Sequence, residues 1–75
     1  NDLTTSELAS FDKLKQQRAL WAKERNVPAY VVFHDATLID IARTAPKTLS
    51  QLLAVNGLGK TKLELYGDKI IALLS

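Results

Sequence analysis

Gly59-Lys60-Thr61 is the segment closest to a known catalytic motif, because it matches the last three residues of a phosphate-binding P-loop. The complete P-loop also requires a glycine five residues before the second glycine, and Ala54 occupies that position. A P-loop follows a buried strand, and no such strand pattern precedes this segment. We therefore predict that the chain binds no nucleotide here.

The other residue types that support catalysis or metal binding are scarce. The chain has no Cys and a single His, which excludes a Cys-based zinc site and a His-rich metal site. No Ser/His/Asp set or paired carboxylates stand out. His34 precedes a candidate helix cap, where a solvated or cap-bonding imidazole is expected. The sequence predicts a non-enzymatic chain without a cofactor or metal.

The turn Gly57-Leu58-Gly59 is a candidate phosphate site between two short predicted helices. Such a turn presents backbone N–H groups at a helix start, where the helix dipole favours an anion. Lys60 and Lys62 add positive charge nearby. The unit resembles a helix-hairpin-helix, which binds the phosphate backbone without contacting the bases. A tight corner that needs glycine only for steric reasons explains it equally well.

Tyr30, together with the basic end of the first predicted helix, is a candidate single-strand site. Pro28 holds the backbone extended before it, and Arg18, Lys23 and Arg25 lie in the second half of that helix. An exposed aromatic ring stacks on a base while neighbouring cations track phosphates. Alternatively, the cations only complement the helix dipole and the ring is half-buried, which the residues alone favour slightly.

Acidic residues gather near the start of the first predicted helix, namely Asp2, Glu7 and Asp12. Compensation of the helix dipole explains them. They also make one end of the domain acidic, which could meet a basic partner domain. We keep them as a possible docking face.

The apolar pattern predicts an all-α fold, a compact bundle of five helices with one long and four shorter. Thr4 and Glu7 have capping-box spacing, and a helix follows to Arg25. Its apolar stripe consists of Leu8, Phe11, Leu14 and Trp21, with Arg18 between them. A buried connector over 27–33, extended or of one turn, comes next. The second helix is capped by Asp35 and ends at Ala45-Pro46, and the third is capped by Thr48 and Gln51. After the turn Asn56–Gly59 we expect a fourth helix, Lys60–Tyr66, and a fifth that begins at Gly67.

Length and charge limit the possible classes of protein. Seventy-five residues form one domain at most, and the apolar content of 47% is that of a globular chain. The net charge of +2 does not by itself indicate nucleic-acid binding. No secretion signal or membrane span is predicted. The chain starts at Asn1 and contains no Met, so we expect residues 1–75 to be one domain cut from the C-terminal part of a larger cytosolic protein.

Several segments together resemble a known domain. They are Pro28-Ala29-Tyr30-Val31-Val32-Phe33, Asp35-Ala36-Thr37-Leu38, Pro46, Leu52-Leu53-Ala54-Val55-Asn56-Gly57-Leu58-Gly59, Lys62-Leu63 and Tyr66-Gly67. In type and spacing they resemble the HRDC domain, the "helicase and RNase D C-terminal" module. Their residues are more similar to the HRDC domain of bacterial RecQ helicases than to that of RNase D.

The resemblance implies an auxiliary, monomeric module that binds DNA weakly and tunes substrate choice for an attached ATP-dependent DNA helicase. The expected partners are DNA, whether single-stranded, junction or partial-duplex, and the helicase core. The expected location is the nucleoid of a bacterial cytoplasm, and the expected processes are DNA repair and recombination. Tyr30, Arg18 and Arg25 match positions that are aromatic or basic in bacterial RecQ versions. Ala19 and Leu20 replace residues that are often basic. The alternative is a docking module with little DNA binding of its own.

Overall fold

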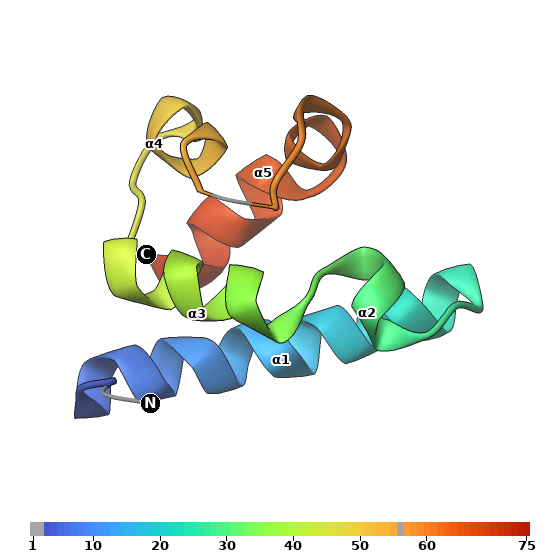
Figure 1. Cartoon of the computed structure of the whole chain (residues 1–75), viewed down its shortest axis with the longest axis horizontal. Coiled ribbons are helices and arrows are strands. Elements are labelled where there is room, and N and C mark those ends of the chain that lie inside the picture. Colours follow the sequence, from blue (N-terminus) through green and yellow to red (C-terminus); the bar gives the residue numbers. More distant parts are fainter. Residues whose placement is uncertain (1–2, 56) are drawn as a thin grey trace.

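The computed structural model describes residues 3–55 and 57–75. Their regular secondary structure consists of helices only, in agreement with the predicted all-α class. They are α1 (Thr5–Arg25), α2 (Ala29–Val32), α3 (Asp35–Thr44), α4 (Leu49–Leu53) and α5 (Lys60–Leu74). Figure 1 shows α3 lying along α1, with α2 beside the C-terminal end of α1. The helix α4 packs against α5, and α5 also contacts α1. The count of five is confirmed, but the helices are divided differently from the prediction.

Local signals fix both ends of α1. The Thr4 hydroxyl accepts a hydrogen bond from the Glu7 amide at 3.2 Å, and Glu7 Oε1 accepts one from the Thr4 amide at 2.9 Å. This confirms the predicted capping box. Asn26 ends the helix in the left-handed conformation, with φ of 57°. Asn tolerates that region better than most residues, which is why the helix stops there.

The predicted connector is the one-turn helix α2 and its flanks. Val32 and Phe33 are fully buried, whereas Tyr30 and Val31 are exposed. A single helical turn was one of the two predicted forms of the connector, but only the second half of the connector is buried. Because one turn presents side chains in all directions, the segment fills the core and also places an aromatic ring in solvent.

The start of α3 differs from the prediction. His34, not Asp35, is the capping residue, and its side chain makes no capping hydrogen bond. The amides of Thr37 and Leu38 bond to the His34 carbonyl. Asp35 instead directs its carboxylate to α1. At the other end Ala45 is left-handed, with φ of 46°, and Pro46 follows, so the predicted stop is confirmed.

The helix α4 has half of its predicted capping box. The Thr48 hydroxyl accepts from the Gln51 amide at 3.2 Å, as expected. Gln51 Oε1, however, accepts from the Lys47 amide at 2.7 Å rather than from that of Thr48.

The predicted break at Gly67 is wrong, because α5 is one helix that runs through it. Gly67 is buried, and a Cβ atom there would lie 2.8 Å from Leu49 Cδ2 and 3.2 Å from Leu63 Cδ1. A glycine inside a helix costs about 1 kcal/mol relative to alanine. Here it lets α4 pack closely against α5, so close packing offsets the cost.

Candidate nucleic-acid interface

Three buried aromatic rings hold together the end of the molecule where α1 finishes. The Trp21 and Tyr66 ring centroids are 4.4 Å apart, and those of Phe33 and Tyr66 are 5.5 Å apart at an interplanar angle of 64°. Trp21 also meets Phe33 edge to face. The predicted core positions of Trp21 and Phe33 are confirmed. The cluster joins α1, the α2–α3 connection and α5.

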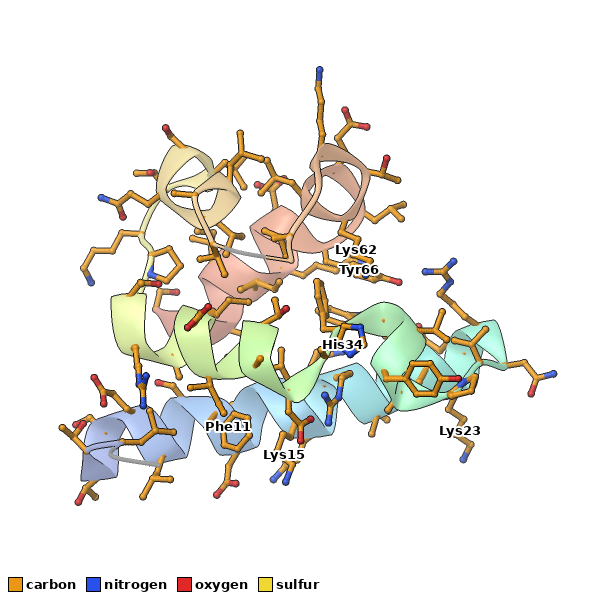
Figure 2. All side chains as sticks on the ribbon, in the orientation of Figure 1. Phe11, Lys15, Lys23, His34, Lys62 and Tyr66 are labelled. Carbon is orange, nitrogen blue, oxygen red and sulfur yellow. The ribbon has the colours of Figure 1, made fainter. Side chains whose placement is uncertain are left out.

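Two cations from different helices lie on this cluster. Arg25 Nη1, in the last turn of α1, donates to the Tyr66 hydroxyl at 3.0 Å. Lys62 Nζ, in the first turn of α5, lies 5.3 Å from the centroid of the Phe33 ring, within cation–π range. Figure 2 shows Lys62 and Tyr66 on α5, across from His34. The aromatic cluster therefore brings together the predicted cations Arg25 and Lys62, 37 positions apart in the sequence.

Tyr30 is 62% exposed, so the alternative of a half-buried ring is wrong. Its ring is stacked with that of His34, with centroids 6.2 Å apart and planes inclined by 25°. His34 is exposed as well. Sequence reasoning left His34 out of the site, although its spacing of four from Tyr30 was a usable signal. Two neighbouring rings, those of Tyr30 and His34, are therefore both exposed to solvent.

The expectation that Arg18 lies on the same surface is wrong. Its guanidinium is buried, and Nη1 donates to the Phe33 carbonyl at 3.0 Å and to Asp35 Oδ1 at 2.6 Å. This side chain ties α1 to the start of α3, and it has no free face for a phosphate. Lys23, in contrast, is exposed, and Figure 2 shows it pointing away from the helix bundle.

The Arg18 guanidinium also changes the acidity of Asp35. Its hydrogen bond and its charge lower the pKa of the Asp35 carboxyl below the ordinary 3.8, with smaller effects from Lys15 and His34. A folded-state pKa below the unfolded value contributes stability that is present above pH 3.8 and is lost as the pH falls through the folded-state pKa. The ion pair is thus a source of acid sensitivity.

Asp35→Asn is accordingly expected to be less stable than the native chain at pH 7, and the difference should shrink as the pH falls below 3.8. Thermal melting from pH 7 to pH 3 measures this difference. A difference that stays constant over the whole range would show that the Asp35 charge does not cause it.

The two glycines of the predicted turn have different roles. Gly57 has φ of +85°, and a Cβ atom there would collide with Thr37 Oγ1. Gly59 has φ of −81° and open space around its Cα, and it caps α5 without a side-chain bond. Only Gly57 therefore requires the left-handed region that favours glycine. Asn56 of this turn lies outside the described residues. Lys60 follows, exposed, at the start of α5.

The predicted acidic face is only partly available. Glu7 uses one carboxylate oxygen in the capping box, whereas Asp12 is exposed. Asp2 lies outside the described residues. Of the two predicted acidic residues that the structure describes, Glu7 has a structural role and Asp12 is exposed.

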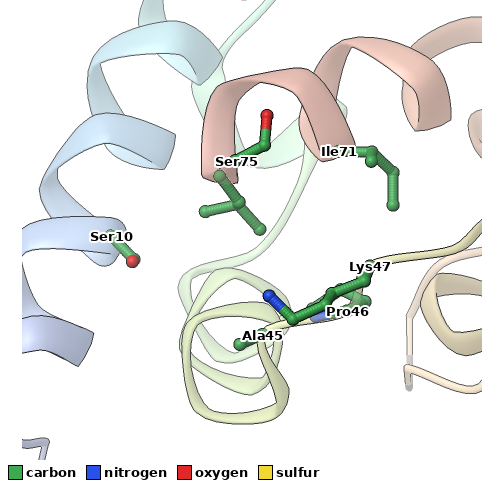
Figure 3. Close-up of a pocket in the computed structure, with 7 residues that line it drawn as sticks. Ser10, Ala45, Pro46, Lys47, Ile71 and Ser75 are labelled. Carbon is green, nitrogen blue, oxygen red and sulfur yellow. The ribbon is translucent and has the colours of Figure 1, made fainter.

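A groove of about 180 Å³ lies near Ser75, at the C-terminal end of α5 (Figure 3). Its lining carries one charged side chain and two hydroxyls, and no carboxylate, imidazole or thiol; the residues are Ser10, Ala45, Pro46, Lys47, Ile71, Leu74 and Ser75. The residues that the structure describes contain no cluster of potential metal ligands. None of their helices is long and apolar enough to cross a membrane.

Comparison with known proteins decides the family. The model of the HRDC domain matches residues 7–74, nearly the whole chain. The chain belongs to the HRDC domain family. This confirms the resemblance found in the sequence. The third HRDC domain of Deinococcus radiodurans RecQ has the same fold, with a TM-score of 0.88 and 34% identity over 93% of this chain and 92% of that one.

The relatives of this HRDC domain are DNA helicases. It is 50% identical over 62 residues to the ATP-dependent DNA helicase UvrD2 of Mycobacterium tuberculosis, and 39% identical over 64 residues to the ATP-dependent DNA helicase RecQ of Pasteurella multocida. These matches cover 83% and 85% of the chain. The chain spans only 9–10% of the length of these relatives. The HRDC domain is therefore an accessory, non-catalytic part of such enzymes.

Proposed function

We propose that this HRDC domain is an auxiliary module of an ATP-dependent DNA helicase of the RecQ or UvrD2 type, and that it holds single-stranded DNA. The observation that carries the proposal is the solvent-exposed Tyr30 ring at the end of the molecule where Arg25 and Lys62 are fixed on the aromatic cluster. A duplex hides its base faces, whereas a single strand offers them for stacking. The exposed ring therefore favours unpaired bases.

The cations of this end suit the phosphates of the same strand. Arg25 comes from the end of α1, and Lys60 and Lys62 come from the start of α5, and each can contact one phosphate. Three contacts to a single strand give a slope of log K against log salt of roughly −2. Such binding is weak at physiological salt, which suits a module that assists a motor.

Two substitutions separate the base contact from the phosphate contact. Tyr30→Ala should weaken binding to oligo-dT by about fivefold or more and leave the salt slope unchanged, because it removes stacking and no charge. Arg25→Ala should weaken binding and make the slope shallower by about 0.7, because it removes one phosphate contact. Fluorescence anisotropy of a labelled oligo-dT at several low salt concentrations measures both.

Leu8→Ala is the matched control, since Leu8 is 49% exposed and lies 17 residues before Arg25 on the same helix, about 25 Å away. It should bind like the native chain. If the native chain fails to bind oligo-dT even at low salt, the proposal is wrong. The module would then act through docking on the helicase core, with Asp12 on its acidic side.

A further inference from the structure

We infer that His34 is the second half of the stacking surface, so that the domain takes two consecutive unpaired bases rather than one. This inference rests on the proposed function and specifies its substrate. The His34 and Tyr30 rings are 6.2 Å apart with planes inclined by only 25°, and both are exposed. Neighbouring nucleotides of a single strand can therefore each find an aromatic face.

The imidazole is free for this role. His34 caps α3 through its backbone carbonyl, which accepts from the Thr37 and Leu38 amides, and its side chain makes no capping bond. Its aromatic neighbour is Tyr30, which is also exposed. No structural requirement of the described residues uses the His34 ring. Its replacement should thus leave the fold intact.

Charge near His34 favours a base over a phosphate there. The Asp35 carboxylate follows directly, and its side chain remains 66% exposed although Arg18 is paired with it. A phosphate next to this carboxylate is disfavoured, whereas a neutral base face is not. Arg25 and Lys62 are instead held on Tyr66 and Phe33, at the end of α1 and the start of α5. The strand is therefore oriented with its bases on the rings of Tyr30 and His34 and its phosphates toward the ends of α1 and α5.

An abasic oligonucleotide with the same number of phosphates isolates the contribution of the bases. The native chain should bind oligo-dT more tightly than the abasic strand. His34→Ala should reduce this preference by about three- to tenfold without changing affinity for the abasic strand, whereas His34→Phe should retain the preference. Arg25→Ala, as a matched control, should weaken binding to both strands alike.

The imidazole also gives a direct signal, because the chain contains one His and its ring resonances are unique. In NMR titrations, oligo-dT should shift the His34 ring protons upfield, as stacking on a base does, and the abasic strand should not. The inference is overturned if His34→Ala keeps the full preference for oligo-dT or if both strands shift the ring protons equally. Loss of the preference in Tyr30→Ala but not in His34→Ala would leave the proposed function standing and remove only the second base.

Discussion

Arg18→Ala is expected to lower the free energy of unfolding by about 2–4 kcal/mol. The substitution removes a buried side-chain stem and leaves the Phe33 carbonyl without its donor. A buried unsatisfied polar group costs about 1–3 kcal/mol, and the lost packing adds to it. The free energy of unfolding of a domain of this size rarely exceeds about 3–5 kcal/mol, so a large fraction of the variant should be unfolded. Urea unfolding followed by tryptophan fluorescence measures the loss.

Arg25→Ala is the matched control for Arg18→Ala, because the two arginines lie seven residues apart on α1. Arg25 is exposed and loses one hydrogen bond, to the Tyr66 hydroxyl, so its cost should stay near 1 kcal/mol. The pair therefore separates the structural role of Arg18 from the DNA contact proposed for Arg25. If Arg18→Ala were as stable as the native chain and still bound oligo-dT poorly, Arg18 would contact DNA directly, against its burial here.

Gly57→Ala is expected to cost about 2–3 kcal/mol of stability. A φ of +85° is strained for alanine, and such strain costs on the order of 1–3 kcal/mol. The new Cβ would also collide with the hydroxyl of Thr37, which is buried and cannot move freely. The measurement is the same urea titration.

Gly59→Ala provides the comparison within the same turn. Its φ is −81° and no atom lies within 4 Å of an added Cβ, so only the change of capping residue remains, at less than about 1 kcal/mol. Equal losses in the two variants would contradict the different roles assigned to these glycines. A larger loss at Gly59 would do so as well.

Local signals in the sequence predicted most of the fold. The capping box of Thr4 and Glu7, the stop at Asn26 and the stop before Pro46 depend on residues within a few positions of each other. Such caps and breakers act through nearby backbone groups, so they can be recognised without the tertiary structure. The same local reasoning, that a glycine ends a helix, predicted a break at Gly67, and this prediction was wrong. The neighbouring Leu49 comes from another helix, and only packing reveals it.

The candidate site was less predictable, for the same reason. Arg18 was assigned to DNA because of its charge, although it lies between Leu14 and Trp21 of the apolar stripe and is buried like them. Its partners Phe33 and Asp35 are 15 and 17 residues away, so the pattern of one helix could not show them.

The anchoring of Arg25 by Tyr66 spans 41 residues and has no local signal at all. The exposure of Tyr30 was predicted only as one of two alternatives. It follows from the direction of a single helical turn, which depends on how Val32 and Phe33 enter the core.

The close contact between Trp21 and Tyr66 also provides an intrinsic fluorescence signal for the domain. Trp21 is the single tryptophan of the chain, it is buried, and its ring lies 4.4 Å from that of Tyr66, whose hydroxyl accepts from Arg25. Unfolding transfers the indole to water and moves its emission to longer wavelength. A phosphate that draws Arg25 away from Tyr66 alters the ring next to the same indole. One unlabelled emission spectrum therefore reports the folding of the domain and provides a test of the phosphate contact proposed for Arg25.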